Sequence, residues 1–201
     1  MTNLRRGKIT GLILLPVAAL LLVQMNCPEQ GLSISTDGRR LARLKNRAVP
    51  PLREEFDGRV TLAALLQAGD DRQRWSESRA AAVEGYVLLV KKAGIESANC
   101  YCPSRRDIHI EVALRLDAPP TERAILEITP PMSDRAERDG WDWSDDALDR
   151  ELTGHWCRFE GWLLFDTHHA SESENISPGR ERNWRATAWE IHPITRLQVL
   201  Q

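Results

Sequence analysis

The chain has 201 residues, of which 42% are hydrophobic and 28% are charged, and its formal net charge at pH 7 is -2. This composition excludes a wholly disordered protein, because the hydrophobic content suffices to build a core. The slight negative charge gives no overall attraction for the phosphates of a nucleic acid. The length fits one folded domain with additional segments.

Residues 1–27 predict a segment that directs the chain to a membrane. Arg5, Arg6 and Lys8 precede an apolar run over residues 9–25, as in a secretory signal peptide or an uncleaved signal anchor. The basic residues place the N-terminus in the cytoplasm. We therefore expect residues 9–25 to contact the bacterial inner membrane, with the C-terminal domain in the periplasm, or the domain to be secreted after cleavage.

The rest of the chain divides into a linker and one domain. Residues 28–57 are polar and basic and contain the Pro50-Pro51 pair, which is typical of a solvated linker. Residues 58–201 contain the apolar segments and predict the folded part of the protein.

Alternating apolar and polar residues predict five strands in this domain. Their ranges are 83–90, 108–116, 123–129, 156–166 and 184–200, the last interrupted at Pro193. In the second strand the apolar face consists of Ile108, Ile110, Val112, Leu114 and Leu116. Between the third and fourth strands, Ser144 is a candidate N-cap for a short helix. This order predicts an all-β domain, an OB-fold-like five-stranded Greek-key barrel with a helix between strands three and four.

Four short segments add a resemblance to a known group. Residues 96–100, 107–111, 159–166 and 189–193 together resemble an uncharacterised family of bacterial proteins with a predicted OB-like β-barrel domain. The resemblance covers roughly residues 80–200. It implies the same barrel fold and brings no activity with it.

Two of the strands carry polar residues that are candidates for ligand binding. Asp107, His109 and Glu111 share one face of the second strand, and Glu190 and His192 share one face of the fifth. The simpler interpretation is that each set is the solvent-facing half of an alternating strand. These two strands are not neighbours in an OB barrel, so we do not expect one site to contain both sets. No cofactor and no metal-ligand set is predicted.

The cysteines suggest an oxidising compartment and a disulfide. In an OB barrel the end of the first strand lies beside the start of the fourth, which predicts a bond between Cys100 and Cys157. Cys102 is a competing partner.

Two functions stay open. A binding module for a protein, a glycan or a small ligand agrees with the lack of a specific catalytic motif in the sequence. The alternative is a metal-assisted hydrolase that uses His109, His192 and nearby carboxylates at the barrel rim. Of these two functions, we favour the binding module, which is not an enzyme. Nucleic acid is not an expected partner, because the second strand carries no aromatic residue on which a base could stack.

Overall fold

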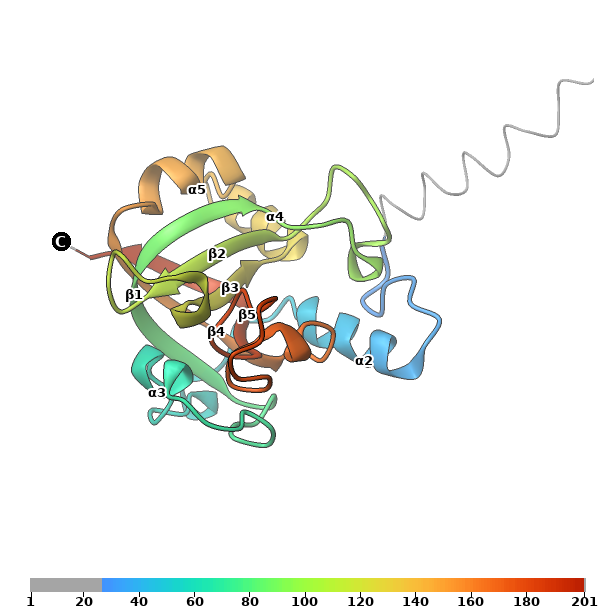
Figure 1. Cartoon of the computed structure of the whole chain (residues 1–201). Coiled ribbons are helices and arrows are strands. Elements are labelled where there is room, and N and C mark those ends of the chain that lie inside the picture. The colour runs from blue at the N-terminus through green and yellow to red at the C-terminus, as the bar shows by residue number, and fades with distance from the viewer. Residues whose placement is uncertain (1–26, 201) are drawn as a thin grey trace, which may run out of the picture.

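The computed structural model describes residues 27–200, which fold around a closed barrel of five strands (Figure 1). The strands are β1 (Ala80–Lys92), β2 (Ile108–Ala113), β3 (Ala124–Ile128), β4 (Trp156–Phe165) and β5 (Trp189–Val199). Their order around the barrel is β1-β2-β3-β5-β4, with β3 and β5 parallel and every other pair antiparallel. The predicted all-β class is confirmed, and the barrel is compatible with an OB-like domain.

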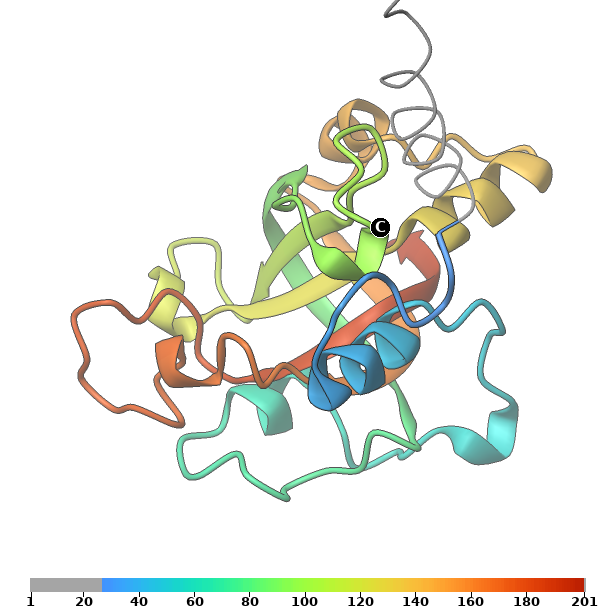
Figure 2. The ribbon, with the colours of Figure 1, turned by 90° about the vertical axis from the view of Figure 1, so that its right-hand side faces the viewer.

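Helices cover both ends of this barrel. They are α2 (Thr36–Lys45), α3 (Leu62–Leu66), α4 (Pro130–Arg138) and α5 (Asp145–Leu152), with short 3-10 turns η1 (Arg53–Glu55), η2 (Ser97–Asn99), η3 (Pro120–Glu122) and η4 (Ala170–Glu172). The α4 and α5 helices lie at one end and α3 at the other (Figures 1 and 2). Ser144 caps α5 as predicted, because its side chain accepts a hydrogen bond from the backbone N–H of Ala147.

The α4 helix is absent from the prediction. The predicted third strand ends at residue 129, and β3 ends at Ile128, just before the Pro130-Pro131 pair. Proline also favours the first turn of a helix, where its missing N–H would have no partner in any case. The same two residues therefore end one element and begin the next.

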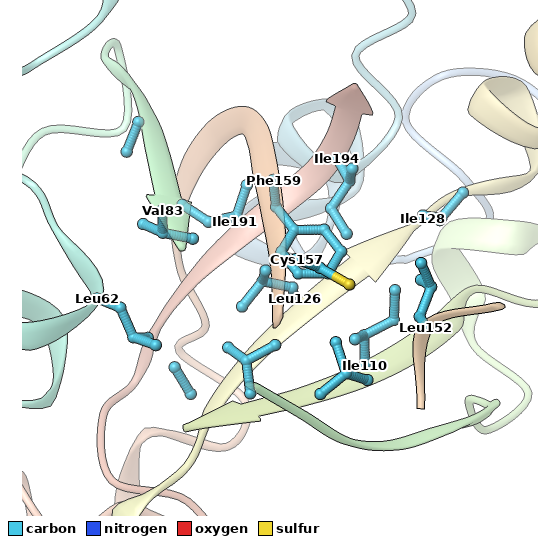
Figure 3. Packing of buried hydrophobic residues seen from close by; sticks show 14 of the residues in the cluster. Leu62, Val83, Ile110, Leu126, Ile128, Leu152, Cys157, Phe159, Ile191 and Ile194 are labelled. Atoms are coloured by element: carbon cyan, nitrogen blue, oxygen red, sulfur yellow. The ribbon is translucent and has the colours of Figure 1, made fainter. Parts of the chain in front are cut away.

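The barrel interior is filled by the apolar halves of the alternating strands (Figure 3). Ile110, Leu126 and Phe159 are completely buried there. The expected apolar face of the second strand is wrong at its end, since Leu114 and Leu116 are 48% and 70% exposed. They follow Ala113, where β2 stops and the chain turns toward η3.

The predicted disulfide between Cys100 and Cys157 is wrong. Cys100 is bonded to Cys27 instead, with their Cα atoms 5.7 Å apart, and Cys157 is a free, buried thiol in the barrel core (Figure 3). The reason is the length of β1, whose first half pairs with β4 and whose second half pairs with β2. Cys157 lies opposite Gly85 in the first half, whereas Cys100 follows the end of the second half.

The segment 28–57, expected to be a polar linker, contains a helix that packs on the barrel. Ser35 caps α2 by accepting a hydrogen bond from the backbone N–H of Gly38, and Leu41 and Lys45 on the inner side of the helix are buried. The helix contacts η2 and β5 (Figure 2).

The predicted membrane-directed run, residues 9–25, lies outside the described residues. Within residues 27–200, no helix combines the length and the apolar character that crossing a bilayer requires.

Candidate functional site

Charged side chains gather on the outer face of β2, β3 and β5. Apolar residues of these strands point into the barrel, so the alternate positions His109, Glu127 and Glu190 point outward. These and their neighbours form what we call the buried ion network. Its members are six carboxylates (Glu96, Asp107, Glu111, Glu127, Asp166, Glu190), four permanent cations (Lys45, Lys91, Arg123, Arg185) and three histidines (His109, His169, His192).

Glu127 on β3 connects the two sets of candidate residues. One carboxylate oxygen, Oε1, lies 3.1 Å from Nδ1 of His109 on β2, and the other, Oε2, lies 3.3 Å from Nδ1 of His192 on β5. The expectation that the second and fifth strands would not share a site is wrong, because β3 lies between them and supplies the bridging residue.

His192 has no solvent exposure and is surrounded by carboxylates. Its Nδ1 is 2.9 Å from Oε2 of Glu190, and its Nε2 is 3.5 Å from Oδ2 of Asp107. Burial by itself lowers the pKa of His192, but its close contacts with the carboxylates of Asp107 and Glu190 and the charge of Glu127 outweigh burial and raise the pKa to about 10.

Glu111 lies at the opposite side of the network. Its carboxylate is 3.3 Å from Nε2 of His109, 2.8 Å from Nη1 of Arg123 and 3.3 Å from Nζ of Lys91. Burial by itself raises the pKa of Glu111. The hydrogen bonds from His109 and Arg123 have a larger, opposite effect, and the pKa falls to about 2. The interpretation of Asp107, His109 and Glu111 as a solvent-facing set is therefore wrong, since all three side chains are buried.

The chain between β4 and β5 covers the network from outside. Arg185 is completely buried, and it donates hydrogen bonds to Oδ2 of Asp166, at 3.1 Å, and to Oε1 of Glu190. Its guanidinium lies 4.7 Å from the ring centroid of Trp184. Asp166 also lies 2.7 Å from Nδ1 of His169. The ion pair between Arg185 and Glu190 thus holds this segment against β5.

Several network residues are not identified by the sequence alone. Glu127 lies between the apolar residues Leu126 and Ile128 of the predicted third strand, so alternation places it on the opposite face from these two. Lys45 was assigned to the linker, although its Nζ lies 2.5 Å from Oε2 of Glu96. No local pattern marks Arg185, whose partners come from β5 and from the end of β4.

A pocket of about 280 Å³ opens onto the network, and we call it the network pocket. Glu127 and Glu190 contribute to its lining, together with the rings of His109, His169 and Trp184. The Trp184 ring centroid lies 5.9 Å from that of His109 and 5.7 Å from that of His169. The volume lies just below the usual range for ligand pockets, which suits a small ligand, and fixed polar groups beside an apolar surface are typical of such sites.

No protein-family model matches this chain, and no curated protein matches it either. The resemblance to an uncharacterised bacterial family with an OB-like domain therefore stays a prediction.

Proposed function

We propose that this domain is a binding module, active outside the cytoplasm, that takes a small polar ligand in the network pocket. The observation that carries the proposal is that ionisable groups of the buried ion network line an open pocket beside Trp184. Burying many charges is an inefficient way to stabilise a barrel, because desolvation offsets most of the attraction between them. Groups that are fixed in position for a ligand give a reason for keeping them.

The residues that line the network pocket define the chemistry of the ligand. The carboxylates of Glu127 and Glu190 are acceptors that line the pocket. The Trp184 ring supplies an apolar face, and Lys91 and Lys92 lie half-exposed where the pocket opens. A ligand with hydroxyl or amine donors and one flat or apolar face, such as a sugar, would use all of these groups.

The proposed location rests on two observations. The disulfide between Cys27 and Cys100 favours an oxidising compartment. The basic and apolar residues before Cys27 match an export signal or an anchor. We therefore propose that residues 9–25 contact the inner membrane and that the barrel lies in the periplasm, or is secreted.

Thermal unfolding in the presence of single sugars and amines tests the binding proposal. A ligand of the native state raises the melting temperature by mass action. We expect at least one compound to stabilise the wild type but not the Trp184→Ala protein. The control is Trp141→Ala, which removes an exposed ring outside the network pocket and should be stabilised like the wild type. No stabilising compound, or equal stabilisation of both variants, contradicts the proposal. Melting curves without ligand check that each variant is folded.

A metal-assisted hydrolase is the second candidate, favoured by the convergence of Asp107, Glu127 and His192 in one place. Turnover of a p-nitrophenyl ester that requires added zinc and is lost in the His192→Gln protein would support it. Zinc-independent turnover, or none, would contradict it.

A further inference from the structure

Three side chains from three neighbouring strands converge at the centre of the buried ion network. Asp107 lies just before β2, Glu127 is on β3 and His192 is on β5. Each offers one atom capable of binding a metal, and these three atoms all lie within 4.8 Å of one another. The residues are 1%, 6% and 0% exposed, so the convergence is not a chance cluster of surface carboxylates.

Each of the three residues has one polar atom that makes no hydrogen bond with the described part of the protein. Among the described residues, Oδ2 of Asp107, Oε2 of Glu127 and Nε2 of His192 are buried without a hydrogen-bond partner. A buried polar atom without a partner is costly, so native proteins contain few of them. Three such atoms in one place indicate that something outside the chain binds them.

The other polar atom of each residue is already held. Oδ1 of Asp107 accepts a hydrogen bond of 2.8 Å from Asn99, and Nδ1 of His192 lies 2.9 Å from Glu190. Oε1 of Glu127 lies 3.1 Å from His109. Metal ligands typically have this arrangement, in which an outer hydrogen bond fixes one atom of a side chain and leaves the other atom for the ion.

The distances also fit a shared ion. Two ligands at about 2.1 Å from a tetrahedral metal lie about 3.4 Å apart, and Nε2 of His192 lies 3.5 Å from Oδ2 of Asp107. A carboxylate and an imidazole at this separation can bind the same ion without moving. The third ligand atom, from Glu127, lies within 4.8 Å of the other two.

The charges of the network support a divalent ion. Its six carboxylates exceed its four permanent cations by two, and five of the six carboxylates are buried. A buried net charge is strongly unfavourable unless something balances it. Protons on two histidines would supply two positive charges, and so would one divalent cation, which in addition uses all three unpartnered atoms.

We propose that Asp107, Glu127 and His192 bind a divalent transition-metal ion. An imidazole in the ligand set disfavours calcium and magnesium, which take oxygen ligands, and favours ions of the zinc and manganese type. The site goes beyond the proposed binding module, because Asp107 and His192 do not line the network pocket and the site does not involve Trp184. Loss of metal binding would leave the comparison of Trp184→Ala with Trp141→Ala unaffected, so the two proposals can fail separately.

The site is tested by calorimetric titration of the full chain with zinc chloride, after a chelator has removed any bound metal. We expect one zinc ion per chain in the wild type, and at least a tenfold weaker affinity in Asp107→Asn, Glu127→Gln and His192→Gln. Calcium chloride should give no binding. The control variants Asp117→Asn and His168→Gln alter exposed residues outside the site and should bind zinc like the wild type. No saturable zinc binding in the wild type, or unchanged affinity in the ligand variants, overturns the proposal.

Cobalt(II) absorption keeps the test decisive if the ligand variants do not fold. Cobalt added to the wild type should give visible d–d bands without the near-ultraviolet charge-transfer band of a thiolate ligand, and zinc should remove the bands. A thiolate band would show that Cys102 or Cys157 binds the ion and would overturn the assignment.

Discussion

Oε2 of Glu127 lies 3.3 Å from Nδ1 of His192, and this contact joins the third strand of the barrel to the fifth. The two strands are parallel neighbours, although more than sixty residues separate Glu127 from His192 in the sequence. Polar residues that look like unrelated strand faces therefore belong to one buried network. The contact of Glu127 with His192 follows from the barrel order, which places β3 beside β5.

The first prediction concerns the barrel core and the end of β2. Ile110→Ala should lower the free energy of unfolding by about 3 kcal/mol, because it leaves a cavity in a completely buried position. Leu116→Ala should change it by less than about 0.5 kcal/mol, since that side chain is 70% exposed. Urea denaturation measures both variants. Similar losses from the two substitutions would mean that the strand continues beyond Ala113.

The second prediction concerns the pH dependence of Glu111. Its pKa falls from an ordinary value near 4.5 to about 2 on folding, so the charged form stabilises the native state. This contribution is complete above pH 4.5 and is lost as the pH falls toward 2. We expect Glu111→Gln to lose about 2 kcal/mol at pH 7 and clearly less at pH 3.5.

Urea denaturation at the two pH values, with Glu137→Gln as a control, tests this dependence. Glu137 is an exposed carboxylate on α4 and should show almost no effect at either pH. A loss in Glu111→Gln that is as large at pH 3.5 as at pH 7 would show that packing, not charge, makes the side chain important.

The third prediction concerns the cysteines. The bond between Cys27 and Cys100 spans 73 residues of sequence, and chain entropy gives it about 4 kcal/mol of stabilisation. Cys27→Ser should therefore lower the free energy of unfolding by about that amount. Burial raises the pKa of the Cys157 thiol to about 11, so this cysteine should resist alkylation at pH 8 until the protein is unfolded.

Peptide mapping of unreduced protein from the periplasm tests this pairing directly. It should identify a peptide that joins Cys27 to Cys100 and should leave Cys102 and Cys157 as free thiols. A peptide that joins Cys157 to either Cys100 or Cys102 would contradict the arrangement of β1 described above.

The part of the fold that could be predicted from the sequence is the part with a local signature. Alternation located all five strands, and the hydroxyl of Ser144 marked the start of α5. The disulfide pairing could not be predicted, because it depends on where along β1 the partner changes from β4 to β2. The change falls at Tyr86, which pairs with both β2 and β4, and no residue near Cys100 indicates it.

The candidate site could be predicted only in part. Alternation placed His109 and Glu190 on outer faces, but it cannot tell an outer face that meets solvent from one that other segments cover. The covering segments are α2, which provides Lys45, and the chain after β4, which provides Arg185. Neither has a periodic pattern that reveals what it packs against.

The claim that the outer face of β2, β3 and β5 is a functional site is tested most directly by anomalous diffraction. Crystals of the full chain grown with zinc chloride should be measured at the zinc absorption edge. We predict one strong peak about 2.1 Å from Oδ2 of Asp107, Oε2 of Glu127 and Nε2 of His192. An empty density map at these three atoms, with zinc bound elsewhere or not at all, would contradict the account.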